Sequence, residues 1–136
     1  MANEAVIVEL LGNRGDVINY NVADGNAIAK GAILQLTDDR TAAASAADKP
    51  VAGIAASEKV ASDGQTTLGC YTNGIFDILD SGGGGAVGVN VVLGGVNTVK
   101  DAAAGNAETG LIFGKRFATA GGGGTEEVRV LVGKHH

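Results

Sequence analysis

The sequence predicts an all-β fold, a small β-barrel or β-sandwich made of two sequence-related halves with short Ala-rich connectors. Three observations lead to this prediction. First, 23 of the 136 residues are glycine, and scattered glycines disfavour helices because each interior Gly costs about 0.5–1 kcal/mol relative to Ala. Second, runs of branched aliphatic residues alternate with turn residues along the chain. Third, parts of the first half recur in the second half at offsets of 59 and 60 residues.

The predicted strands are runs rich in Val, Ile and Leu that are bounded by turn residues. They are Ala5–Leu10, Asp16–Val22, Ala32–Leu36, Val51–Ala55, Thr67–Thr72, Gly74–Leu79, Val87–Leu93, Leu111–Phe113 and Val128–Val132. The Ala-rich stretches 41–47 and 101–107 are predicted to be loops with at most one helical turn, because so short a helix is unstable alone in water. Asn73-Gly74, which lies between two predicted strands, predicts a hairpin turn over Thr72–Ile75.

Two segments of the first half match two segments of the second half. Ala27–Leu34 matches Ala86–Leu93 at an offset of 59, and Gly64–Tyr71 matches Gly124–Leu131 at an offset of 60. Self-similarity of this kind indicates tandem units that share one strand order. Because two units are too few for a solenoid, each is expected to supply part of one shared core.

The repeats define the expected domain organisation. We expect residues 1–22 to form an N-terminal arm and the first strands, and residues 23–136 to form a single β domain built of pseudo-repeats at about 24–80 and 84–133. In the last predicted strand, Leu131 lies on the face opposite to the valines, because side chains alternate along a strand. An apolar residue on that face indicates that another subunit covers part of it.

The charge balance is acidic, with a net charge of −5 from 10 Lys and Arg and 15 Asp and Glu. Nucleic acid is not an expected partner, because phosphate recognition needs a basic face. No apolar run approaches the roughly 20 residues of a membrane helix and no signal peptide is recognised, so we expect no membrane partner and synthesis in a cytoplasm. The single cysteine, Cys70, is expected to be a small buried hydrophobe in a strand.

Side chains suited to catalysis are few, and the sequence predicts no enzyme, no cofactor and no metal ion. The only histidines, His135 and His136, are the last two residues, where chains are normally mobile. The runs Gly82–Gly85 and Gly121–Gly124 lead into Val-containing segments, whereas a phosphate loop leads into a helix and usually carries a Lys. We therefore interpret the first glycine run as an assembly contact.

Several short motifs of Gly and aliphatic residues follow one another after about Tyr20. They are Gly31–Leu36, Pro50–Ala55, Gly64–Gly69, Asn73–Phe76, Val87–Asn90, Gly110–Lys115 and Glu126–Gly133. Their order and spacing resemble the tailed-phage capsid decoration proteins, also called head cement proteins. This family has no catalytic signature, so the resemblance assigns no functional side chain.

The resemblance implies a structural protein of the bacteriophage virion, made in the host cytoplasm. Such a protein binds the exterior of an icosahedral shell, often as a homotrimer, and stabilises contacts between subunits of the major capsid protein. Residues 1–11 would then be an arm that adds a strand to a partner; the alternative is the first strand of the chain's own sheet. Candidate contacts with the capsid protein or with further copies of this chain are Val6, Ile7, Val8, Leu10, Leu11, Gly82, Gly83, Gly84, Gly85 and Leu131.

Two other classes of protein compete with this hypothesis. One is a self-assembling extracellular filament or sheath subunit of the same fold, which strand exchange through residues 1–11 could build. The other, less favoured, is a small ligand-binding domain such as a lipoyl-like domain. That domain would need a Lys at an exposed hairpin tip, and the best predicted tip, Asn73-Gly74, carries none.

Overall fold

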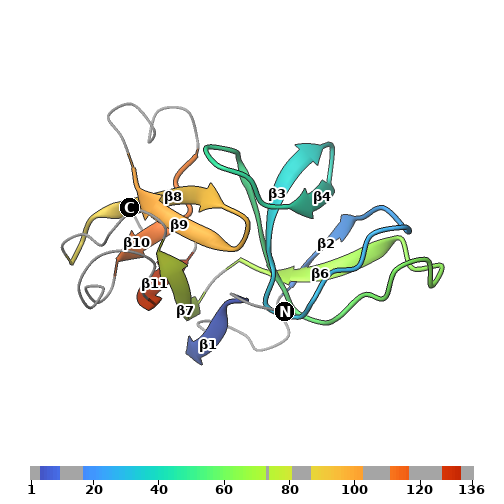
Figure 1. Cartoon of the computed structure of the whole chain (residues 1–136), viewed down its shortest axis with the longest axis horizontal. Helices are drawn as coiled ribbons and strands as arrows, with labels where there is room; N and C mark the ends of the chain where they lie inside the picture. Colours follow the sequence, from blue (N-terminus) through green and yellow to red (C-terminus); the bar gives the residue numbers. More distant parts are fainter. Residues whose placement is uncertain are drawn as a thin grey trace.

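A computed structural model describes residues 4–9, 17–72, 74–80, 87–102, 111–116 and 127–132. Within these ranges the chain contains strands and no helix, which confirms the predicted all-β class (Figure 1). The strands are β1 (Val6–Glu9), β2 (Ile18–Asn21), β3 (Ile33–Asp38), β4 (Thr41–Ala44), β5 (Val51–Ala55), β6 (Thr67–Tyr71), β7 (Gly74–Asp80), β8 (Asn90–Gly95), β9 (Thr98–Asp101), β10 (Gly114–Arg116) and β11 (Glu127–Val132).

The first half of the chain forms a closed five-stranded barrel in the order β2-β4-β3-β5-β6. Its interior is aliphatic and built of small residues, and the hydroxyl of Tyr20 donates a hydrogen bond to the carbonyl oxygen of Ala52 at 2.9 Å. The buried side chains of this core are Tyr20, Val22, Ile28, Leu34, Ala42, Ala52, Ala55, Leu68 and Cys70. Small residues fit here because a five-stranded barrel leaves little internal volume.

The second half forms a sheet in the order β7-β11-β10-β8-β9, with β1 added to the outside of β7. An additional parallel pairing joins β7 to β9, so these five strands also form a ring. We call the two rings barrel 1 and barrel 2; Figure 1 shows them side by side. The second core contains Ala5, Ile33, Ile54, Phe76, Ile78, Val91, Leu93, Val99 and Phe113. Because Ile33 and Ile54 come from barrel 1, this core also forms the contact between the barrels.

The two barrels share one connectivity and one register. Strand pairs related by the repeat have the same partners, including the single parallel pairing in each barrel. The matched pairs are Leu34↔Gly53 with Val91↔Gly114, Leu36↔Ala42 with Leu93↔Val99, Tyr20↔Leu68 with Ile78↔Val128, and Asn21↔Thr41 with Leu79↔Thr98. The chain is therefore a structural duplication, as the sequence halves predicted.

One of the two predicted sequence offsets is wrong by two residues. Strand pairing relates Leu34 to Val91, an offset of 57 and not 59, whereas the offset of 60 for β6 and β11 is confirmed. The backbone marks the same offset, since Gly31 and Gly88 have φ angles of 90° and 91°, a conformation that favours glycine. The error arises because apolar residues recur at every second position, at Val89, Val91 and Leu93, so that a shift of two residues aligns them almost equally well.

Three strands form where loops or no element were predicted. One of them, β10 (Gly114–Arg116), follows the predicted strand Leu111–Phe113, whose residues form no strand. The Ala-rich stretch 41–47 contains β4, and β9 covers Thr98–Asp101, of which only the last residue lies in the second Ala-rich stretch. Residues 103–107 lie outside the described part of the chain. Alanine has low strand propensity, but β4 forms because it completes barrel 1 between β3 and β2, where the buried Ala42 fits the narrow interior.

The predicted hairpin at Thr72–Ile75 is also wrong. Both edges of β6 pair within barrel 1, with β2 and β5, and β7 pairs within the other sheet. The chain therefore passes from one barrel to the other at this point. Asn-Gly favours a tight turn, but a hairpin needs flanking strands whose edges are free for each other.

Buried polar groups from the two halves of the chain are paired with each other beside strands β4 and β9. The side-chain oxygen of Asn97 accepts a hydrogen bond from the backbone N–H of Ile33 at 2.8 Å. The backbone N–H of Asn97 donates to the Ser45 hydroxyl, which in turn donates to the carbonyl oxygen of Gly95. Both polar side chains are buried, so these bonds satisfy groups that would otherwise be costly to bury.

Candidate interaction surface

The segment singled out from the sequence as an arm is the outermost strand of a sheet. Strand β1 pairs antiparallel with β7, with Val6 opposite Asp77 and Ile7 opposite Phe76. Of the two alternatives, the structure therefore has Val6, Ile7 and Val8 in the chain's own sheet. Its other edge pairs with no described strand, and Ile7 remains 38% exposed. Figure 1 shows β1 at the lower margin of the view, beside β7.

The residue that precedes β1 is fixed against both barrels. The backbone N–H of Ala5 donates to the carbonyl oxygen of Gly31 in barrel 1 at 2.7 Å, and the Ala5 side chain is buried in the second core. A Cβ on Gly31 would lie 2.6 Å from the Ala5 carbonyl oxygen. Glycine is thus required at position 31 both by its positive φ and by this close approach.

The other predicted contacts are not brought next to β1 by any described feature. Leu10, Leu11 and Gly82–Gly85 lie outside the described residues. Leu131 lies in β11, where it is opposite Ile75 of β7 and Lys115 of β10. The backbone of β11 is therefore paired on both sides within the sheet.

Further aliphatic side chains are exposed on both barrels. The large hydrophobic residues with substantial exposure are Ile7, Val17, Ile18, Val60, Val87 and Val96. Val17 and Ile18 are adjacent at the start of β2, and Ile18 is 42% exposed although its strand lines barrel 1. Neighbouring exposed aliphatics on a strand are more informative than single ones, because isolated surface hydrophobes are common.

A buried lysine that no sequence pattern predicted joins two loops of barrel 1. The ammonium of Lys59 donates to the carbonyl oxygens of Asp24, Asn26 and Val60 at 2.6, 3.2 and 3.1 Å. Its side chain is fully buried, and the carboxylates of Asp24 and Asp63 lie at 3.8 and 3.5 Å. No spacing in the sequence marks Lys59, because its acceptors are backbone carbonyls that any residue supplies.

The carboxylate of Asp63 lies beside the Lys59 ammonium and is partly exposed. Its pKa lies below the usual value, chiefly because the backbone N–H of Gln65 donates to it, and also because the Lys59 ammonium is near. A lowered pKa means that the folded state favours the ionised carboxylate. The contribution of Asp63 to stability is therefore present at neutral pH and is lost as pH falls through that lowered pKa.

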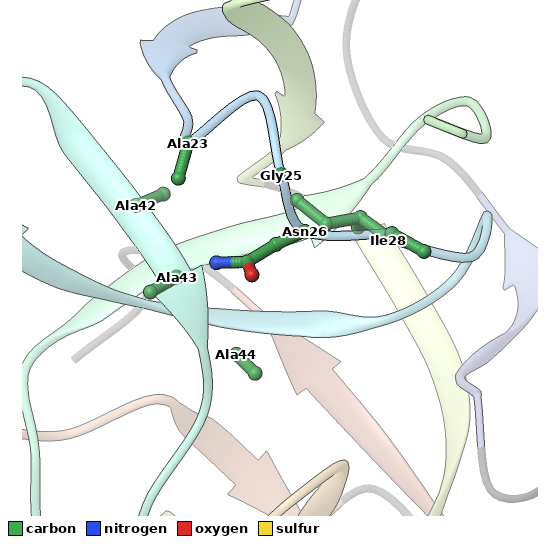
Figure 2. A pocket seen from close by; sticks show the side chains of 8 residues that line it. Ala23, Gly25, Asn26, Ile28, Ala42, Ala43 and Ala44 are labelled. Atoms are coloured by element: carbon green, nitrogen blue, oxygen red, sulfur yellow. The ribbon is translucent and has the colours of Figure 1, made fainter. Parts of the chain in front are cut away.

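A pocket of about 410 Å³ lies between the loop after β2 and strand β4. Figure 2 shows the side chains of Ala42, Ala43 and Ala44 along one wall and Asn26 on the other. Apart from Asn26 and Ile28, the lining side chains are alanine or glycine. The pocket therefore offers a shallow surface of small groups and a single side-chain amide.

Within the described ranges, no group of three or more His, Cys, Asp or Glu could hold a metal ion. Nor does any helix there have the length and hydropathy needed to span a membrane. The predicted state of Cys70 is confirmed: it is buried in β6 as part of the barrel 1 core.

The Cys70 thiol is expected to be nearly inert in the folded protein. Burial raises its pKa to about 12, and the thiolate is the reactive form. At pH 8 we expect iodoacetamide to modify the folded protein at least about 100-fold more slowly than the urea-unfolded chain, because reaction needs local opening. A cysteine at the exposed Ser57 is the control and should react rapidly in both states. Fast modification of Cys70 in the native protein would contradict this.

Comparison with known proteins finds no protein-family model that matches the chain and no curated protein that is significantly similar to it.

Proposed function

We propose that this protein is a structural protein that decorates the exterior of an icosahedral phage-type shell. It binds the major capsid protein and stabilises contacts between neighbouring capsid subunits, and it assembles with further copies of itself. The proposal rests on the motif resemblance together with one structural observation: β1, the segment expected to contact a partner, is the edge strand of its sheet and has an unpaired outer edge among the described strands.

An edge strand suits this role because its free N–H and C=O groups can pair with an extended segment of a partner. Ile7 adds an exposed aliphatic side chain to the same strand. On a shell, many weak contacts repeated over neighbouring subunits give a strong total attachment.

The proposal is tested by binding to shells of the virus whose genome carries the coding sequence. Purified protein is mixed with expanded empty shells and with unexpanded procapsids, and the shells are pelleted. We expect the protein to pellet with the expanded shells and to appear on their outer surface by electron cryomicroscopy. Polymers of the protein that form without shells, with no binding to shells, would favour the filament alternative and overturn the proposal.

A matched pair of variants tests the part played by β1. Ile7→Glu places a charge at an exposed position of β1. Val60→Glu places the same charge at an exposed aliphatic position far from β1 in the sequence, in barrel 1. We expect Ile7→Glu to weaken shell binding at least about tenfold, since each 1.4 kcal/mol of lost contact is a factor of ten. Val60→Glu should bind as the unmodified protein does. Equal binding by both variants would exclude β1 from the contact.

A further inference from the structure

The duplication reveals a strand position that is filled in barrel 2 and has no described strand in barrel 1. Strand β1 covers the edge of β7 at Ile75–Asp77, before β9 begins to pair with β7 at Leu79. The repeat relates this stretch of β7 to Val17–Asn19 in barrel 1, because Phe76↔Val130 corresponds to Ile18↔Cys70. We call the edge of β2 at Val17–Asn19 the β2 slot.

Exposure differs between the two positions, and no described strand covers Val17–Asn19. Phe76 is also buried by its place in the core that contains Ile33 and Ile54. Next to β1, Ile75 and Phe76 are 7% and 0% exposed, whereas their equivalents Val17 and Ile18 are 36% and 42% exposed. The equivalent residues are chemically similar. Ile75 and Val17 are both aliphatic, and Phe76 and Ile18 are both large and apolar. In the third pair, Asp77 corresponds to Asn19, which is also exposed.

Among the described residues, the side chain of Arg40 reaches into the β2 slot. The guanidinium of Arg40 donates to the carbonyl oxygen of Asn19 at 2.8 Å, and the Arg40 carbonyl oxygen accepts from the N–H of Asn21 at 2.6 Å. Polar backbone groups two residues apart point to the same edge of a strand, so the Asn19 carbonyl faces the slot. In barrel 2 the equivalent of Asn19 is Asp77, and there the strand partner is Val6 of β1.

Arg40 has an equivalent in the second half of the repeat whose side chain lies elsewhere. Its equivalent in barrel 2 is Asn97, and both residues have positive φ, 45° and 58°. Asn97 turns its side chain to the barrel junction and leaves the edge of β7 to β1. A charged side chain on a free edge is a common device that limits strand pairing.

We propose that the β2 slot accepts the N-terminal segment of a second copy of this chain. The segment Val6–Glu9 already occupies the equivalent slot in its own barrel 2, which identifies it as an occupant of suitable sequence and register. The incoming strand covers Val17 and Ile18 and displaces the Arg40 guanidinium from the Asn19 carbonyl. This contact joins copies whether or not the protein decorates a shell, so it does not rest on the proposed function.

The test uses the full chain and a fluorescent synthetic peptide of residues 2–11, with binding followed by fluorescence anisotropy. Arg40→Asn introduces the residue that barrel 2 has at the same positive φ, so it removes the guanidinium from the β2 slot without straining the backbone. We expect this variant to bind the peptide at least about tenfold more tightly than the unmodified protein. Ile18→Glu, which places a charge under the incoming strand, should bind at least about tenfold more weakly.

Disulfide trapping shows which slot the peptide enters. A peptide carrying V6C should cross-link to a protein carrying Asn19→Cys, since directly opposed strand residues are within disulfide distance. Ser57→Cys, an exposed position off the strands, is the control and should trap little peptide. Absence of peptide binding by Arg40→Asn, or trapping at Asp77→Cys in preference to Asn19→Cys, overturns the proposal.

Discussion

Replacing Lys59 with methionine is expected to lower the free energy of unfolding by about 3 kcal/mol. The substitution removes the donor to the carbonyl oxygens of Asn26 and Val60 and leaves the carbonyl oxygen of Asp24 with only the N–H of Ser62. A hydrogen bond to a charged group contributes about 1.5–3 kcal/mol. Methionine retains most of the apolar stem, so the loss reports the ammonium and not a cavity. Urea unfolding should show a lower midpoint, and Tm should fall by roughly 10 °C.

Lys30→Met is the matched control for this prediction. Lys30 is exposed, so its replacement should change the free energy of unfolding by less than about 0.5 kcal/mol. A Lys59→Met protein as stable as the unmodified one would contradict the prediction. That result would mean that the loops around residues 24 and 60 hold their positions without the charge, as happens in some proteins whose buried ion pairs are replaced by apolar groups.

Replacing Asn97 with alanine is expected to cost about 3 kcal/mol. The backbone N–H of Ile33 loses its acceptor inside the barrel junction, which costs about 1–3 kcal/mol. A φ of 58° at this position adds strain for alanine, of about 1 kcal/mol. Chemical denaturation measures the total loss, and amide hydrogen exchange at Ile33 should accelerate by more than the global change predicts.

Asn97→Gly separates the two causes. Glycine accepts the positive φ without strain, so this variant should lose only the contribution of the hydrogen bond, about 2 kcal/mol. It should therefore be more stable than Asn97→Ala by about 1 kcal/mol. If the two variants are equally unstable, backbone strain plays no part, and if neither is destabilised, the junction does not depend on Asn97.

The strand-rich core of this fold could be predicted from residue pattern. Branched runs such as Val51–Ala55 and Thr67–Thr72 match β5 and β6 closely, because a strand inside a small barrel needs aliphatic side chains on its inner face. By contrast β4 was not predicted. Its alanines become a strand only because the barrel needs a member between β3 and β2, and this requirement is tertiary.

The candidate sites, like the strands, could be predicted from the sequence only in part. The apolar run Val6–Val8 predicted a strand but did not show which sheet it joins, because the side chains of a strand do not determine its partner strand. The β2 slot could not be predicted for the same reason. Val17 and Ile18 are apolar residues typical of a buried strand, and only the structure shows that they are exposed. Lys59 escaped prediction because its acceptors are main-chain oxygens.

Because β1 pairs with β7, this strand gains its partner only after all of barrel 1 has been synthesised. Val6 and Asp77 are opposite each other although 71 residues separate them. Barrel 1, which lies between them in the sequence, can close on the ribosome as soon as β6 emerges. Until β7 is made, β1 has no partner in its own molecule, and the cost of closing so long a loop further delays it. In a cell where many copies are translated together, the newborn chain therefore passes through a stage in which β1 is available to a neighbour.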